Sequence, residues 1–217
     1  MVLYVNGDSH SAGHDAGGLA FSYGQHIANA LGAEFTCDAL AGCGNDRIIR
    51  TTKEYLKSNT PDFIIIGWST WEREEWHHED KTYTVAGGGH SQLPLELQER
   101  YKEWVIRLDT SSEQHRIEDV AHRKIWQFHL ELEEQEIPHL FFNCYSHYFY
   151  THAYAKPKYP WGNCYLDPYD QNFAYYYWLE KQGFTPSNPK FYHYGPDAHV
   201  AWADFLLPKV KKLLTSI

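Results

Sequence analysis

Short apolar runs alternate with longer amphipathic stretches along the chain, a pattern that predicts strands alternating with helices. The clearest strand candidate is Asp62–Gly67, because its continuous apolar run is typical of a strand buried on both faces of a parallel sheet. Shorter apolar runs predict three further strands, at Val2–Val5, Phe35–Leu40 and Leu140–Asn143.

The stretches between these runs carry apolar residues at helical spacing. A helix is predicted over Leu19–Leu31, where Gly32 is a typical C-terminal stop, and a last helix begins at Pro196. Asn45 is the expected N-cap of another helix. Strands alternating with helices indicate a three-layer α/β/α sandwich around a mostly parallel sheet. The remaining helices are predicted at 45–56, 97–108, 111–132 and 172–182.

Two segments depart from this alternation. Residues 72–95 are polar, rich in histidine and interrupted by three glycines, so we expect an excursion or lid there. Residues 145–170 form a long segment of Tyr, His, Pro and Trp, which predicts an aromatic loop. The length fits a single domain, which we expect to span residues 1–217 and to include both segments.

Charge and hydrophobicity narrow the classes of function. The 28 Asp and Glu against 19 Lys and Arg give a net charge of −9, the wrong sign for nucleic-acid binding. No apolar run approaches the roughly 20 residues of a membrane span, and no basic segment leads into an apolar one after Met1. We therefore expect a cytoplasmic protein without a signal peptide, with no nucleic-acid and no membrane partner. The pattern gives no indication of oligomeric state.

The cysteines and histidines show no spacing that is typical of a metal site. Fourteen histidines are scattered without an H-E-x-x-H motif or a Cys/His zinc pattern. We therefore expect no metal and no other cofactor. The four cysteines form no C-x-x-C pair and are expected to be reduced thiols: Cys37, Cys43, Cys144 and Cys164.

Candidate chemistry is found where the predicted strands end, since α/β folds bind ligands beyond the carboxyl ends of their strands. Ser9 follows the first strand in Gly7-Asp8-Ser9, so its hydroxyl can attack and its backbone N–H can stabilise an oxyanion. Gly42 follows the second strand just before a helix, where open N–H groups can hold an anion. Each of these short motifs also fits an ordinary turn.

Two more candidates complete the set. Ser69 follows the third strand in Gly67-Trp68-Ser69-Thr70, and His193 lies in the turn before the last helix. From that turn His193 can reach the first strand's serine. The alternative base is His199, with Asp197 as its acid, although His199 falls within the first turns of the helix.

Taken together in this order, these motifs resemble those of the SGNH (GDSL-type) hydrolases. Gly7-Asp8-Ser9 matches the first block of that family, and the stretch from Gly42 to Ile48 matches the second. The resemblance implies a flavodoxin-like fold with a five-stranded sheet. It also implies that Ser9 is the nucleophile and His193 the general base. The oxyanion hole would then consist of the backbone N–H groups of Ser9 and Gly42 together with the Ser69 hydroxyl.

Two positions depart from the family pattern. Ser69 stands where the family has an oxyanion-hole Asn, and Lys190 stands three residues before His193, where the family has the triad Asp. Three arrangements are open for the imidazole: a backbone carbonyl holds Nδ1–H, Asp197 folds back to it, or the site is nearly inert. We expect the carbonyl, because Asp197 belongs to the following helix.

These observations favour a serine esterase or deacetylase that acts on a small-molecule or glycan ester. The aromatic residues at 68–76 and 145–161 favour a substrate that contains a sugar. A second hypothesis is a catalytically weak or inactive module that keeps the fold and binds a glycan, which the two departures motivate.

Overall fold

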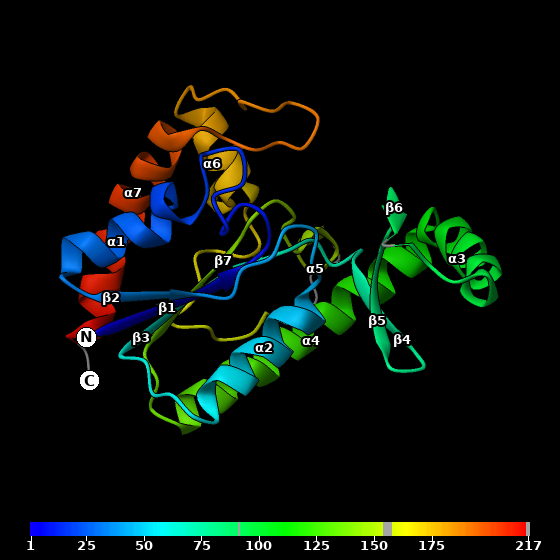
Figure 1. The fold of residues 1–217 in the computed structure, drawn as a ribbon, viewed down its shortest axis with the longest axis horizontal. Helices are drawn as coiled ribbons and strands as arrows, with labels where there is room; N and C mark the ends of the chain where they lie inside the picture. The colour runs from blue at the N-terminus through cyan, green and yellow to red at the C-terminus, as the bar shows by residue number, and fades with distance from the viewer. Residues whose placement is uncertain (91, 154–157, 216–217) are drawn as a thin grey trace.

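The computed structural model describes residues 1–90, 92–153 and 158–215, so small parts of the predicted lid and aromatic loop lie outside it. Its centre is a parallel sheet in the order β2-β1-β3-β7 (Figure 1). The strand predicted at 62–67 is the interior strand β3, which begins at Phe63 and is buried throughout, while Asp62 before it is exposed. The bounds are Val2–Gly7 for β1, Glu34–Cys37 for β2, Phe63–Trp68 for β3 and His139–Asn143 for β7.

The sheet has four strands in the described part of the chain, where five were expected. Beside β7, the place of a fifth strand is taken by a single parallel bridge between Phe141 and Tyr165. Phe141 N donates to Cys164 O, and Leu166 N donates to Phe141 O. Pro168 follows and has no N–H to donate, so the ladder does not extend further along this segment.

Helices cover both faces of the sheet, which confirms the α/β sandwich (Figure 1). Successive residues of β1 point to opposite faces: Leu3 packs with the core under α1, α6 and α7, and Tyr4 packs with the core under α2 and α4. The helices of the first face are α1 (Tyr23–Leu31), α6 (Tyr175–Lys181) and α7 (Pro196–Leu214), and those of the second are α2 (Asn45–Leu56) and α4 (Ser111–Glu134).

Short elements connect these layers. The stretch predicted as one helix over Leu19–Leu31 is divided at Ser22, whose hydroxyl accepts from Gln25 N and caps α1. Gly32 ends α1 at φ 63°, as predicted. The other short elements are the 3₁₀ turns η1 (Leu19–Phe21) and η2 (Gln171–Phe173) and the helix α5 (Phe149–Ala153).

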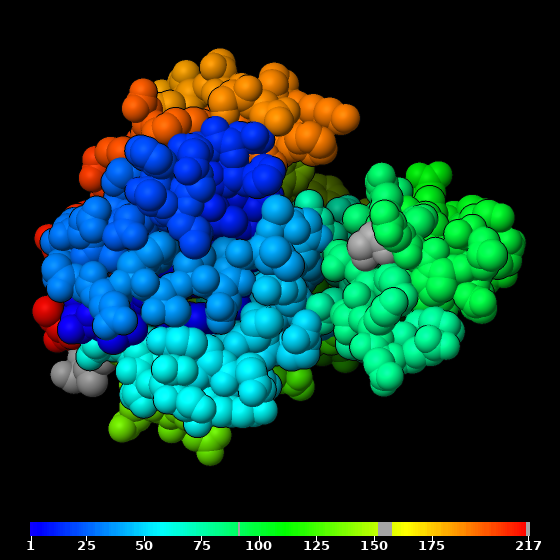
Figure 2. Space-filling model, in the orientation of Figure 1, coloured from blue at the N-terminus to red at the C-terminus, as the bar shows by residue number. Residues whose placement is uncertain are grey.

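The predicted excursion forms a small lobe with its own core. The antiparallel strands β4 (Glu74–His78), β5 (Lys81–Ala86) and β6 (Gly89–His90) lie beside α3 (Leu95–Leu108). Figure 2 shows this lobe standing out from the main body. The buried residues Trp76, Val85 and Trp104 fill its core, and the first turns of α4 join it. None of the described helices is both long and apolar enough to cross a membrane.

Candidate active site

Two glycines allow β1, β3 and the loop after β1 to approach closely at the carboxyl edge of the sheet. Gly7 and Gly67 are partners in the register of β1 and β3, and a Cβ on Gly7 would lie only 2.7 Å from the carbonyl oxygen of Gly67. The Asp8 carboxylate accepts from His10 N at 3.0 Å and tightens the turn. Ser9 is therefore held at the carboxyl edge of the sheet, with 6 % of its surface exposed.

Ser9 and His193, which are far apart in the sequence, are brought together as predicted. His193 Nε2 lies 2.9 Å from Ser9 Oγ. The turn that carries His193 is closed by a bridge in which Asn188 N donates to His193 O and His193 N donates to Asn188 O. This turn directly precedes α7, so the helix anchors the imidazole opposite the serine.

The expectation that a backbone carbonyl holds His193 is wrong, because Asp15 does so. Asp15 Oδ2 lies 2.6 Å from His193 Nδ1. Asp15 adopts the left-handed conformation at φ 60° and lies in the loop after Ser9, where Gly13 and Gly17 also have positive φ. These turns bring a carboxylate six residues beyond the nucleophile to the far side of the imidazole. Asp197 is an exposed residue in the first turn of α7 instead.

The partners of Asp15 define its charge and the tautomer of His193. The hydrogen bond from His193, and a second one from Asn188 Nδ2 at 3.0 Å, lower the pKa of the Asp15 carboxyl. An ionised carboxylate accepts a hydrogen bond from Nδ1–H, so the proton stays on Nδ1 and the lone pair of His193 Nε2 faces the Ser9 hydroxyl. The arrangement is that of a Ser-His-Asp triad.

The sequence predicts that the backbone N–H groups of Ser9 and Gly42 form the oxyanion hole. Neither N–H group donates a hydrogen bond to another described residue. Gly42 lies in an exposed turn at φ 76°, a conformation that suits glycine. The next residue, Cys43, donates its Sγ–H to Gly7 O at 3.3 Å and so fixes this turn beside the end of β1.

Ser69 is held by two side chains whose roles the sequence did not reveal. The Asn45 side chain forms two hydrogen bonds with the backbone of Ser69: Nδ2 donates to Ser69 O at 3.1 Å, and Oδ1 accepts from Ser69 N at 2.9 Å. The expected N-cap role of Asn45 is therefore wrong, and Gly44 occupies that position. Arg73 Nη1 donates to Ser69 Oγ at 2.8 Å and lies 3.3 Å from Asp8 Oδ2. Since the Ser69 oxygen already accepts from a cation, its own proton is left to donate.

His199, the alternative base, is buried away from Ser9. Its Nδ1 accepts from Tyr23 N at 3.2 Å, so it satisfies a donor in the first turn of α1. Its Nε2 is 3.2 Å from the Tyr175 hydroxyl. Burial lowers the pKa of His199 to about 3, which keeps the ring neutral. The geometry gives His199 a structural role.

Four of the aromatic residues in the described parts of 68–76 and 145–161 belong to the core and cannot contact a substrate, whereas Phe149 is 50 % exposed. Trp68, Trp76, Tyr148 and Trp161 are each at most 5 % exposed. The exposed aromatic residues beside the site lie on the turn before α7 instead. Phe191 and Tyr192 are 53 % and 46 % exposed, and the Phe191 ring stacks 6.0 Å from that of His193.

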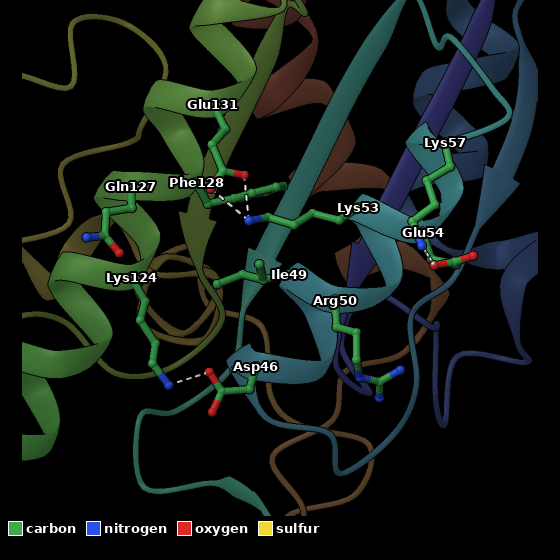
Figure 3. Close-up of a pocket in the computed structure, with 10 residues that line it drawn as sticks. All are labelled: Asp46, Ile49, Arg50, Lys53, Glu54, Lys57, Lys124, Gln127, Phe128 and Glu131. Carbon is green, nitrogen blue, oxygen red and sulfur yellow. Dashed lines mark hydrogen bonds and ion pairs between the residues drawn. The ribbon is translucent and has the colours of Figure 1, made fainter.

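Two hollows open on the α2 and α4 side of the molecule. The larger, about 400 Å³, lies between these helices and contains none of the triad residues (Figure 3). Lysines in its lining form ion pairs with acidic residues of the same lining, as in Lys53–Glu131 and Lys124–Asp46. These charges neutralise one another, so the hollow does not favour a charged ligand. The smaller, about 220 Å³, has Asn45 and Arg73 in its lining and therefore borders the Ser69 side of the site.

Comparison with solved structures identifies the fold. TesA aligns with a TM-score of 0.54 and 10 % identity over 98 % of this chain and 99 % of its own. A G-D-S-L family protein from Desulfitobacterium hafniense aligns with a TM-score of 0.53 and 10 % identity over 96 % and 99 %. The acetyl xylan esterase Est2A from Butyrivibrio proteoclasticus aligns with a TM-score of 0.50 and 14 % identity over 98 % of this chain, which spans 64 % of that esterase. No protein-family model and no curated protein matches the sequence. The chain has the fold of the SGNH (GDSL-type) hydrolases.

Proposed function

We propose that this protein is an esterase that hydrolyses acyl esters with Ser9 as its nucleophile. The observation that carries the proposal is the pair of hydrogen bonds at His193, 2.9 Å to Ser9 and 2.6 Å to Asp15. A serine hydroxyl is a weak nucleophile by itself, and an adjacent base that is oriented by a third group activates it.

The reaction follows from the direction of these hydrogen bonds. His193 Nε2 takes the Ser9 proton as Oγ attacks the acyl carbon, and then donates it to the leaving alcohol. The acyl group remains on Ser9 until a water molecule, deprotonated by the same nitrogen, attacks it and releases the carboxylic acid. Asp15 stays ionised throughout and stabilises the imidazolium.

The oxyanion is held by the N–H groups of Ser9 and Gly42 and by the Ser69 hydroxyl. The bond from Arg73 polarises this hydroxyl, because a group that accepts a charge-assisted hydrogen bond becomes a stronger donor. Arg73 thus compensates for the serine that stands where the family has an asparagine.

The exposed rings beside His193 favour a carbohydrate as the alcohol part of the ester. Tyr192 lies within 5.5 Å of the rings of Tyr145 and Tyr176, which extends the aromatic surface away from Phe191. Such rings present flat apolar faces with polar edges, which suit the faces of a sugar ring. Est2A, whose fold is similar, is an acetyl xylan esterase.

A fluorophosphonate probe and a short-chain aryl ester test the proposal. The wild type should be labelled and should hydrolyse the ester, whereas Ser9→Ala should do neither at an almost unchanged Tm. Ser58→Ala, at an exposed serine, is the matched control and should behave like the wild type. Glycan binding without labelling or turnover in the wild type would show a binding module instead. For the substrate class, Tyr192→Ala should raise KM for an acetylated oligosaccharide but not for an aryl acetate.

A further inference from the structure

Two histidines, a glutamate and a cysteine converge at the amino end of β7. His129 and Glu133 are one turn apart on α4 and share a face, while His139 is the first residue of β7. Cys164 lies on the bridging segment, where its carbonyl accepts from Phe141 N at 2.7 Å. One ligand atom from each of the four side chains lies within 4.8 Å of all the others.

We propose that His129, Glu133, His139 and Cys164 bind one divalent metal ion of the zinc class in a structural site. Imidazole nitrogen and thiolate sulfur favour Zn²⁺, whereas Mg²⁺ and Ca²⁺ prefer sites made of oxygen ligands. A thiolate and a carboxylate together supply two negative charges, which neutralise the ion.

The spacing of the donor atoms is close to that of a four-coordinate site. Ligand atoms about 2.0–2.3 Å from a tetrahedral zinc are about 3.3–3.7 Å apart. Cys164 Sγ and Glu133 Oε1 are already 3.7 Å apart. His129 Nδ1 and His139 Nε2 are 2.7 Å apart. These two nitrogens need to separate by roughly 0.6 Å to admit the ion.

The protons of the cluster can be accounted for. His139 Nδ1 donates to Ile137 O at 2.8 Å, which leaves the Nε2 lone pair for a metal; a carbonyl behind a ligating imidazole is the usual support at zinc sites. In the metal-free state His129 Nδ1–H donates to that lone pair. On metal binding the His129 proton moves from Nδ1 to Nε2. The Sγ proton of Cys164, which Cys164 donates to Glu133 in the metal-free state, is released to solvent.

The location argues for a role in stability rather than in catalysis. His139 and Asn143 are the two ends of β7, so the cluster is about 13 Å along the strand from the edge that carries Ser9, at about 3.3 Å per residue. Trp126 and Trp161 lie 5.0 and 5.5 Å from the His129 ring, while Glu133 is exposed and gives an entry path. A bound ion would join α4, β7 and the bridging segment.

Titration of the metal-stripped, reduced protein with Co²⁺ and Zn²⁺ tests this proposal. Co²⁺ should bind at one equivalent and give visible d–d bands with a thiolate charge-transfer band, and Zn²⁺ should displace it. Zn²⁺ at about 100 times its Kd should raise the Tm by about 5–10 °C. Glu133→Gln changes only an exposed side chain and should weaken binding at least tenfold.

Matched variants locate the ion. Cys164→Ser should abolish the charge-transfer band, whereas Cys37→Ser, at another free and partly buried cysteine, should keep it. His14, Asp15 and His193 form a second cluster close enough for a metal, so Asp15→Asn is the competing test and should leave Co²⁺ binding intact. The proposal is overturned by the absence of one-equivalent binding, by binding that survives both Cys164→Ser and Glu133→Gln, or by binding that is lost in Asp15→Asn.

Discussion

Replacing Asp15 by Asn removes the negative charge beside His193 while keeping the shape of the side chain. The loss of a triad carboxylate costs about 10⁴ in kcat where that carboxylate is buried. The Asp15 side chain is 33 % exposed, so water screens part of its charge and can hydrate the imidazolium in the variant. We therefore expect kcat on a short aryl ester to fall about 10²–10³-fold, with KM changed less than about threefold.

The assay is steady-state hydrolysis together with a Tm measurement on each variant. Asp197→Asn is the matched control, since the same change is made to an exposed carboxylate on α7, and it should alter kcat by less than tenfold. Formate should restore part of the activity of Asp15→Ala, because the position is open to solvent. A folded Asp15→Asn enzyme with kcat within tenfold of the wild type, or an equal loss in Asp197→Asn, would refute the assignment.

Other residues of the site and the core give further predictions. Ser69→Ala should lower kcat about 10²–10³-fold, the usual effect of removing one oxyanion-hole donor. Arg73→Met alone should lower kcat about tenfold. In a protein that already carries Ser69→Ala it should lower kcat little further, because both changes act through the Ser69 hydroxyl; the single and double variants measure this coupling. His199→Gln should lower the Tm and leave kcat within a few-fold. Since burial holds the pKa of His199 near 3 in the fold against 6.5 when exposed, the unfolded chain binds the proton first. The fold should therefore lose stability as the pH falls from about 6.5 toward 3, measured as a falling urea midpoint, and His199→Gln should show a smaller fall.

The four strands of the central sheet and two of the three residues of the proposed triad could be predicted, because they depend on local patterns. The four consecutive apolar residues of β3 point alternately to both faces of the sheet. They are all buried only in an interior strand that helices cover on both faces. Ser9 and His193 are flanked by elements whose ends meet at one edge of such a sheet, so their proximity follows from the topology. Pro196 and Gly32 marked a helix start and a helix end correctly for the same local reasons.

The contact of Asp15, the strands of the lobe and the burial of the aromatic residues could not be predicted, because each depends on long-range geometry. The direction of the Asp15 side chain depends on positive φ angles along its loop, although a carboxylate between glycines so close to Ser9 was a signal of this arrangement. In the lobe, Trp76, Tyr83 and Val85 alternate with polar residues as strands do, but the charged residues between them obscured the pattern. Aromatic composition alone does not separate a buried Trp68 from an exposed ring.

In the proposed triad the acid comes from the loop that carries the nucleophile, and not from the turn before α7. Ser9 and Asp15 lie on one loop, and the opposite turn carries both His193 and Asn188, so the docking of two segments assembles the whole triad. With Asp15 in this role, no acidic residue is needed three residues before His193. The residue there is Lys190, whose Nζ lies 5.1 Å from the centre of the Phe191 ring. Because Asp15 Oδ2 lies 2.6 Å from His193 Nδ1, the proposed triad is complete without a carboxylate at position 190.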